Sequence, residues 1–151
     1  MKLAEALILR ADCQKRIEQL KQRLMRNAKS QEGDSPAENP SQLLHEMEKA
    51  AAELQDLIQR INKTNSEVKL DSAQTLSDAL AVRDVLTVRQ GVYRELAAAA
   101  TVTQDRYTKS EVKFKGNVRV DEIQNKADDI AKERRELDAK IQECNWRTDL
   151  L

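Results

Sequence analysis

The chain has 151 residues, and its 26 basic side chains balance its 26 acidic ones, so its formal net charge is zero. Charged residues make up 34% of the chain and aromatic residues only 3%, which is typical of long helices that pack through aliphatic stripes. The balance excludes a protein that binds nucleic acid or an anionic membrane through its overall charge, so any electrostatic function must be local.

The N-terminal stretch MKLAEALILRAD contains Glu5 and Arg10, which interrupt the apolar core that a signal peptide requires. No apolar run approaches the roughly 20 residues of a membrane-spanning helix. At this length we expect one helical domain over residues 1–151, in a protein of the cytoplasm.

Residues 2–29 and 40–68 are predicted to form two long helices. In the first helix, residues spaced alternately three and four apart form a heptad seam from Leu3 to Asn27. The segment QEGDSPAENP, which contains both prolines of the chain, is predicted to be the loop that follows. Asn39 can cap the second helix, whereas a start at Ser35 would place a proline in the helix interior.

The second helix carries an apolar stripe wider than a single seam. Its predicted seam is Leu44, Met47, Ala51, Leu54, Ile58, Ile61, Asn65 and Val68, flanked by Leu43, Ala50 and Leu57. Such width fits a bundle better than a bare two-stranded coil. Residues 15–29 hold six bases and one acid, whereas residues 43–56 hold four acids and one base. We interpret the basic run as part of a charge pattern between antiparallel helices rather than as a nucleic-acid patch.

The string RINKTN near the end of the second helix is rich in polar residues that are unfavourable in a helix interior. Asn65 occupies a core-type position, where one buried amide can fix the register of packed helices at a cost in stability. The alternative is a polar binding pocket. The candidate residues for these two interpretations are Arg60, Asn62, Lys63 and Asn65.

The third and fourth helices are predicted at about 76–101 and 121–146. Thr75, with Asp78 three residues later, forms a capping box for the third helix. The apolar residues of that helix are Leu76, Ala79, Val82, Val85, Leu86, Val92, Tyr93, Leu96 and the run Ala97–Ala100. Trp146, Leu150 and Leu151 predict a C-terminal tail that docks rather than frays.

Residues 106–119 depart from this helical pattern and contain five bases and one acid. Apolar and basic residues alternate there, and Gly116-Asn117 can form a two-residue turn, so we predict a short β-hairpin at about 110–120. A lone hairpin is marginal in water. It is therefore either a crossover between helices or a basic arm that grips a polyanion or a neighbouring subunit. The candidate interaction residues are Arg106, Tyr107, Lys109, Lys113, Phe114, Lys115 and Arg119.

Phe114 is the only phenylalanine of the chain. We expect the hairpin to stand away from the helices and to complete an oligomer, with this ring in a pocket between subunits.

The sequence predicts no catalytic, cofactor-binding or metal-binding residues. His45 is the only histidine, and a zinc site of the HExxH type or a di-iron site in a helical bundle requires two. Cys13 and Cys144 fall on apolar helical stripes, so we interpret them as small buried thiols rather than as a disulfide.

The strings MKLAEALILRADCQKRIEQL, LIQRINKTN, LSDALAVRDVL, RYTKSEVKF and ELDAKIQECNW together make the chain similar to a family of small bacterial helical proteins of uncharacterised function. Some members of that family carry the label septicolysin. The resemblance covers nearly the whole chain and implies a bacterial, cytoplasmic protein, but it implies no catalytic residues. We expect no cytolytic activity, because a secreted pore-former needs an export route and a membrane-inserting segment.

The expected fold is all-α: four long antiparallel helices in a bundle or in coiled-coil hairpins, with a short β-hairpin between the third and fourth. The expected function is that of a non-enzymatic interaction or scaffold protein that acts as a homo-oligomer, without cofactor or membrane. The alternative is a nucleic-acid-binding protein that uses the basic segment 106–119.

Overall fold

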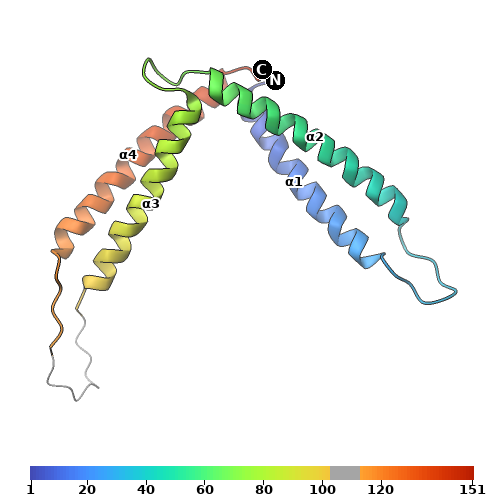
Figure 1. Cartoon of the computed structure of the whole chain (residues 1–151), viewed down its shortest axis with the longest axis horizontal. Coiled ribbons are helices and arrows are strands. Elements are labelled where there is room, and N and C mark those ends of the chain that lie inside the picture. Colours follow the sequence, from blue (N-terminus) through green and yellow to red (C-terminus); the bar gives the residue numbers. More distant parts are fainter. Residues whose placement is uncertain (103–112) are drawn as a thin grey trace. The chain divides into compact units, whose positions relative to one another are not determined.

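The structure, a computed structural model, describes residues 1–102 and 113–151, and the regular structure in these ranges is helical (Figure 1). The helices are α1 (Leu3–Arg26), α2 (Pro40–Glu67), α3 (Leu76–Ala100) and α4 (Val120–Arg147). The β pairings recorded in the described ranges are two isolated bridges, Lys2 with Asp149 and Lys69 with Thr75, so these ranges contain no sheet. The prediction of an all-helical fold with four helices is confirmed.

The chain divides into two compact units. Unit 1 comprises Met1–Leu76 and Gln142–Leu151, so it contains α1, α2 and the end of α4. Unit 2 comprises Ser77–Ile141, which is nearly all of α3 and most of α4. The expectation of one folding domain stays a prediction.

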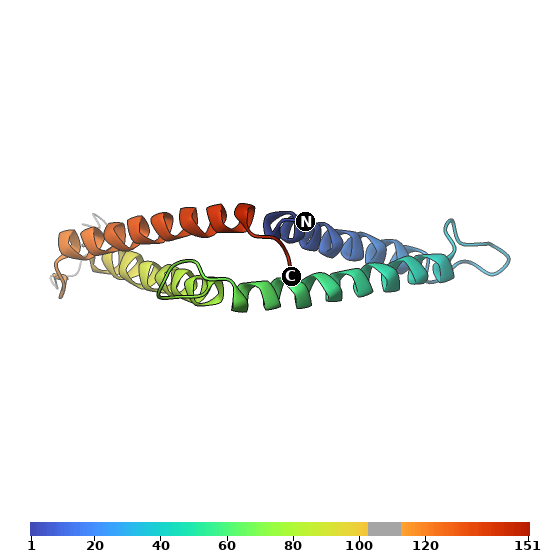
Figure 2. The same cartoon turned by 90° about the horizontal axis from the view of Figure 1, so that it is seen from above.

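In unit 1, α1 and α2 lie side by side and run in opposite directions (Figures 1 and 2). On α1, the side chains of Leu3, Ala6, Cys13 and Leu20 are at most 7% exposed. All four belong to the seam that the sequence predicts, because residues three and four apart lie on one face of a helix. The predicted packing face of α1 is therefore confirmed.

The packing face of α2 is rotated by about one residue from the predicted seam. Leu43 and Leu57, which we predicted to flank the seam, are buried, whereas Leu44 is 48% exposed and Ile58 is 36% exposed. The apolar stripe of α2 is wider than the single face that one neighbouring helix can cover, so hydrophobicity alone did not define its centre.

Because of this rotation, Thr64 rather than Asn65 occupies the buried position at the end of the seam. Thr64 is 0% exposed, and Asn65 is only half-buried. A threonine is the easier residue to bury there, since its hydroxyl can donate to a carbonyl of its own helix, whereas an amide has two donors and an acceptor to satisfy. The role of Asn65 in fixing register stays a prediction.

The loop between α1 and α2 is tied to the end of α1. Asn27 donates from Nδ2 to the carbonyl oxygen of Arg23 at 2.8 Å and accepts at Oδ1 from the backbone amide of Glu38 at 3.0 Å. Arg23 Nε lies 3.1 Å from each carboxylate oxygen of Glu38, and this side-chain hydrogen bond holds the pKa of Glu38 below its usual range. Asn39 then caps α2, its Oδ1 accepting a 2.9 Å bond from the first turn, as predicted.

After α4, the chain pairs with its own N-terminus. The backbone amide of Leu3 donates to the carbonyl oxygen of Thr148 at 2.9 Å. Lys2 Nζ lies 2.8 Å from Asp149 Oδ1, and the hydrogen bond from this lysine holds the pKa of Asp149 below its usual range. The first turn of α1, whose amides lack partners within the helix, is thus partly satisfied by the C-terminal tail.

The end of the tail is bound to α2 through Thr64. Thr64 Oγ1 donates to the carbonyl oxygen of Arg60 at 2.8 Å and accepts from the backbone amide of Leu151 at 3.0 Å. Arg60 Nε donates to the carbonyl oxygen of Leu151 at 3.1 Å. The predicted docking of the tail is confirmed, but its basis is backbone hydrogen bonding, since Trp146 is 55% exposed.

In unit 2, α3 and α4 lie side by side in both views (Figures 1 and 2). The buried residues of α3 include Ala79, Leu86 and Ala97, which share one helical face. Within that face, Arg83 Nη1 lies 2.8 Å from Asp138 Oδ1 of α4, and the two side chains are 26% and 42% exposed. The two small alanines allow close approach, and the ion pair joins the helices at their partly exposed edge.

The predicted β-hairpin at 110–120 is wrong for the part that the structure describes. Residues 113–119 form an extended, irregular segment without strand pairing, and residues 110–112 lie outside the described ranges. Phe114, one of the apolar residues of the alternating pattern, is 83% exposed. An alternating pattern produces a strand only when one face of it is buried, and Phe114 does not find such a surface here.

Replacement of Thr64 by Val should lower the free energy of unfolding by about 1–2 kcal/mol, because the half-buried amide of Leu151 loses its acceptor. Chemical denaturation measures this loss, and hydrogen exchange should accelerate in the tail. Asn65→Ala is the matched control and should cost less, since Asn65 is only half-buried. A larger loss for Asn65→Ala than for Thr64→Val would contradict the assignment of Thr64 as the buried polar residue.

Candidate interaction surface

The four polar residues predicted near the end of α2 do not converge in the described structure. Arg60 is engaged with the tail and with Asp56, whose Oδ2 lies 3.7 Å from Arg60 Nη1. Asn62 and Lys63 are exposed, and Asn65 is half-buried. Arg60 therefore has a structural partner, and the pocket interpretation gains no support from the placement of the other three side chains.

Four of the seven predicted interaction residues lie in the described ranges, in the segment of unit 2 directly before α4. Lys113, Phe114, Lys115 and Arg119 are all exposed. Arg119 lies 3.2 Å from Glu122 and 3.6 Å from an aspartate at the start of α4, so its charge is partly offset. The other three predicted residues, Arg106, Tyr107 and Lys109, lie outside the described residues.

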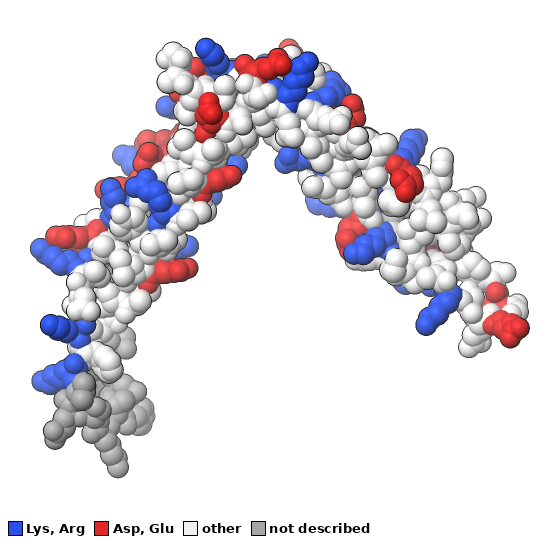
Figure 3. Space-filling view, viewed as in Figure 1, with Lys and Arg blue, Asp and Glu red and all other residues white. Residues whose placement is uncertain are grey.

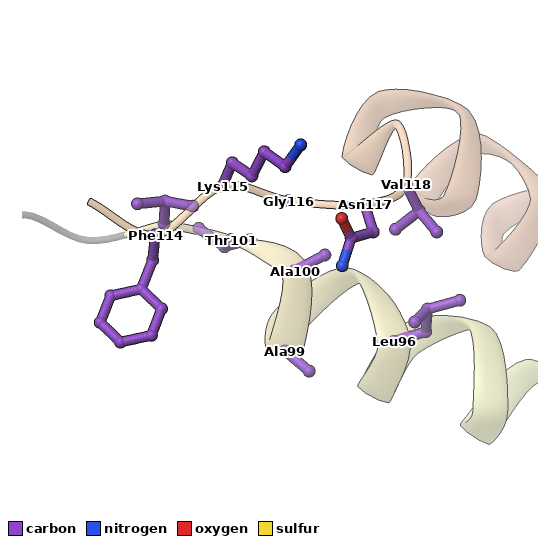
Figure 4. Close-up of a pocket in the computed structure, with 10 residues that line it drawn as sticks. Leu96, Ala99, Ala100, Thr101, Phe114, Lys115, Gly116, Asn117 and Val118 are labelled. Carbon is purple, nitrogen blue, oxygen red and sulfur yellow. The ribbon is translucent and has the colours of Figure 1, made fainter. Parts of the chain in front are cut away.

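A pocket of about 430 Å³ lies between this segment and the end of α3 (Figure 4). Its walls come from Leu96 and residues 99–102, at the end of α3 and just after it, and from residues 114–118. In Figure 4, the side chain of Asn117 points toward Ala100, whereas Lys115 points away from α3. The pocket is open and mostly apolar, and its polar lining includes the Asn117 side chain. Its lining residues do not bring several charged groups together at one point.

Gly116 allows the returning chain to pass close to the end of α3. A β-carbon at this position would lie 3.0 Å from the carbonyl oxygen of Ala100, which is tighter than ordinary van der Waals contact. The opposing atom belongs to the backbone and cannot rotate away. The close approach of residues 114–118 to α3 thus depends on a residue without a side chain.

The most prominent surface of the structure, the outer face of α3, was not predicted from the sequence. We define this outer face as Val82, Val85, Val88, Val92 and Leu96, which are 43%, 57%, 66%, 60% and 38% exposed. Val85, Val88 and Val92 lie on the side of α3 away from its buried residues Ala79, Leu86 and Ala97, whereas Val82 and Leu96 lie nearer to that buried face. A helix with apolar residues on more than one side normally has neighbours on more than one side, so this face has the character of a contact surface.

A shallow groove of about 330 Å³ runs along one edge of the outer face. It is lined by Val82, Val85 and Leu86 together with Arg89 of α3 and Glu133 of α4. The opposite edge carries the acidic residues Asp84 and Glu95, which are both exposed. The outer face is therefore an apolar strip with Arg89 of α3 and Glu133 of α4 on one edge and two carboxylates of α3 on the other.

No group of three or more His, Cys, Asp or Glu side chains in the described ranges could hold a metal ion. Burial raises the pKa of the Cys13 thiol, and the neighbouring carboxylate of Glu53 raises it further, so this thiol is protonated at neutral pH and a poor nucleophile. Cys144 is half-buried, with its sulfur 3.6 Å from the hydroxyl of Thr148.

Basic and acidic side chains alternate over both units on the face drawn in Figure 3. Such interspersed charge differs from the single-sign stripe with which proteins bind nucleic acid. Over the described residues, no helix has the length and apolarity needed to cross a membrane.

Comparisons with known proteins place the chain beside others whose function is unknown. A family model described as a family of unknown function, DUF6847, matches residues 10–150. The chain is 47% identical to a functionally unknown conserved protein from Corynebacterium diphtheriae, whose crystal structure aligns with a TM-score of 0.95 over 100% of this chain and 99% of that one. No curated protein matches the chain, and neither match supports the septicolysin label.

Replacement of Gly116 by Ala should lower the melting temperature, because the new methyl group would press on the Ala100 carbonyl. Gly91→Ala is the matched control. Gly91 lies inside α3, and a β-carbon there would have no atom within 4 Å, so the same added methyl should stabilise by roughly 0.5–1 kcal/mol. Thermal unfolding followed by circular dichroism measures both, and shifts of the same sign would contradict the close approach at Gly116.

Proposed function

We propose that this chain, which belongs to the DUF6847 family of unknown function, is a non-enzymatic interaction protein that works as a homo-oligomer in the cytoplasm. The observation that carries the proposal is the outer face of α3, with five aliphatic side chains exposed to solvent. Soluble monomers rarely expose contiguous apolar patches of this kind, and larger ones mark protein contacts. The contact surface of the oligomer is thus the outer face of α3.

The energetics of this face favour a reversible complex. Full burial of a Val or Leu side chain stabilises by about 1.5–3 kcal/mol, so burial of the exposed half of five such side chains gives about 4–7 kcal/mol per copy. Association itself costs roughly 4–15 kcal/mol. The two magnitudes are comparable, and we therefore expect assembly to depend on protein concentration.

Val88→Asp tests the proposal, since Val88 is the most exposed residue of the outer face at 66%. A carboxylate there would have to be buried without a partner on assembly. We expect the dissociation constant of the oligomer to rise by about tenfold or more, as measured by sedimentation over a series of dilutions.

The matched control is Thr87→Asp, which adds the same charge to the same helix. Thr87 is exposed, and its hydroxyl donates to the carbonyl oxygen of Arg83 at 3.1 Å. It lies about 100° from Val88 around the helix, which places it off the outer face. A parent protein that sediments as a monomer at every concentration, or an equal effect of both variants, would overturn the proposal.

The alternative function, nucleic-acid binding, is favoured by one observation, the exposed lysines Lys113 and Lys115 beside Arg119 in the segment directly before α4. Binding of a short single-stranded oligonucleotide should then weaken as salt rises, because phosphate contacts release counterions. Lys113→Glu combined with Lys115→Glu should lower the slope of log affinity against log salt by about one per lost contact. Unchanged affinity in that double variant would remove this alternative.

A further inference from the structure

We infer that the outer face of α3 is occupied by the outer face of α3 from a second copy, with the two helices parallel. This inference rests on the proposed function and adds to it the occupant and its orientation. Each outer face then has a single partner, the same surface of the second copy, because a twofold axis brings identical surfaces together.

The spacing of the outer face suits a long contact between two helices. Four of its five residues, Val85, Val88, Val92 and Leu96, continue a series with Ala81 and Ala99, at steps of four, three, four, four and three residues, and Val82 lies beside this series on the side of Arg89. This is an eleven-residue repeat, which averages 3.67 residues per turn and lies close to the 3.6 of a straight helix. The strip therefore stays on one side of α3 over its whole length instead of winding around it.

The charges at the edges of the strip determine the orientation. Among the charged residues of α3, Asp84 and Glu95 lie on one edge and Arg89 lies on the other, where Glu133 of α4 lines the same groove. Asp84 is 75% exposed, with Arg83 Nε 3.8 Å away, so it is accessible to a second copy. In a parallel pair the acidic edge of each copy faces the arginine edge of the other, and Asp84 meets the partner's Arg89 five residues further on, the offset of edge ion pairs in parallel coiled coils.

An antiparallel pair would arrange the same charges unfavourably. It turns the acidic edge of one copy toward the acidic edge of the other, so Asp84 and Glu95 would face carboxylates across the contact. It also brings the two Arg89 edges together. Like charges across an interface weaken binding and suppress the wrong arrangement. Charge complementarity thus selects the parallel pair, which contains two Asp84–Arg89 contacts by symmetry.

Charge reversal tests the orientation. Asp84→Arg and Arg89→Asp should each raise the dissociation constant of the dimer by about tenfold or more, because each creates two like-charge contacts. The double variant Asp84→Arg/Arg89→Asp should return to within about threefold of the parent. In an antiparallel pair, Asp84→Arg would instead lower the dissociation constant, because it removes repulsion between the two acidic edges. The double variant would then bind more tightly than the parent rather than return to the parent's affinity.

Disulfide trapping provides a second measurement that does not depend on charge. A thiol introduced by Val92→Cys lies level with its counterpart in a parallel pair, within the separation that a disulfide requires. Under mild oxidation this variant should form a covalent dimer, and the parent, with its buried Cys13 and half-buried Cys144, should not. Covalent dimers that form only in a mixture of Val85→Cys and Val92→Cys proteins would show an antiparallel pair.

The outcomes separate this inference from the proposed function. If Val88→Asp dissociates the oligomer while the charge and thiol variants contradict the parallel pair, the outer face remains the contact surface and the parallel arrangement is wrong. If the parent is monomeric at every concentration, both the self-pairing and the proposed homo-oligomer are wrong. Circular dichroism of every variant confirms that the helices remain folded.

Discussion

Two helices that pack side by side can each bury only one face, and this constraint governs both units. In unit 1, α1 satisfies it with a narrow seam, and most of its remaining surface is polar. In unit 2, α3 buries Ala79, Leu86 and Ala97 and still carries valines on the opposite side. Among the described residues of unit 2, the helix beside α3 is α4, and it leaves those valines exposed. The exposed strip on α3 is therefore a direct result of a helix with two apolar faces in a unit that buries one.

The sequence predicted the helices well, because their limits are set locally. Asn39 caps α2, and Leu3, Ala6, Cys13 and Leu20 of the predicted α1 seam are buried. The centre of the α2 stripe could not be predicted with the same success, since Leu43 and Leu44 are equally apolar neighbours. Which of the two becomes buried depends on how α2 rotates against α1. That rotation depends on how the two helices pack together, so the sequence of one helix does not determine it.

The polar residues illustrate the same limit. Thr64 became the buried polar residue because its hydroxyl serves both Arg60 and the tail, and Leu151 is 87 residues away along the chain. Periodicity cannot show a partner at that distance. The hairpin prediction failed for a related reason. An alternating pattern indicates which side chains share a face of a strand, but it does not show whether another part of the protein is there to bury that face.

The outer face of α3 could have been found from the sequence. Its eleven-residue repeat is visible from Ala81 to Ala99, but we grouped Val82, Val85 and Val92 with the other apolar residues of the third helix as one set. A second apolar stripe on one helix points to a second contact face. The edge charges around Arg89 could also be placed by helical geometry, whereas exposure could not be known before α4 was placed.

The hydrogen bonds between the two ends of the chain also bear on how the protein folds during synthesis. The α1–α2 hairpin is built from local contacts and can form as soon as residue 67 has left the ribosome. Its last partners, Thr148 for Leu3 and Leu151 for Thr64, are made more than 80 residues later. Until then water takes the place of the tail as the partner of the Leu3 amide, and Thr64 Oγ1, which already donates to Arg60 within α2, accepts from water. Closure of this end of unit 1 therefore has to wait for a segment that is synthesised after the whole of α3 and α4.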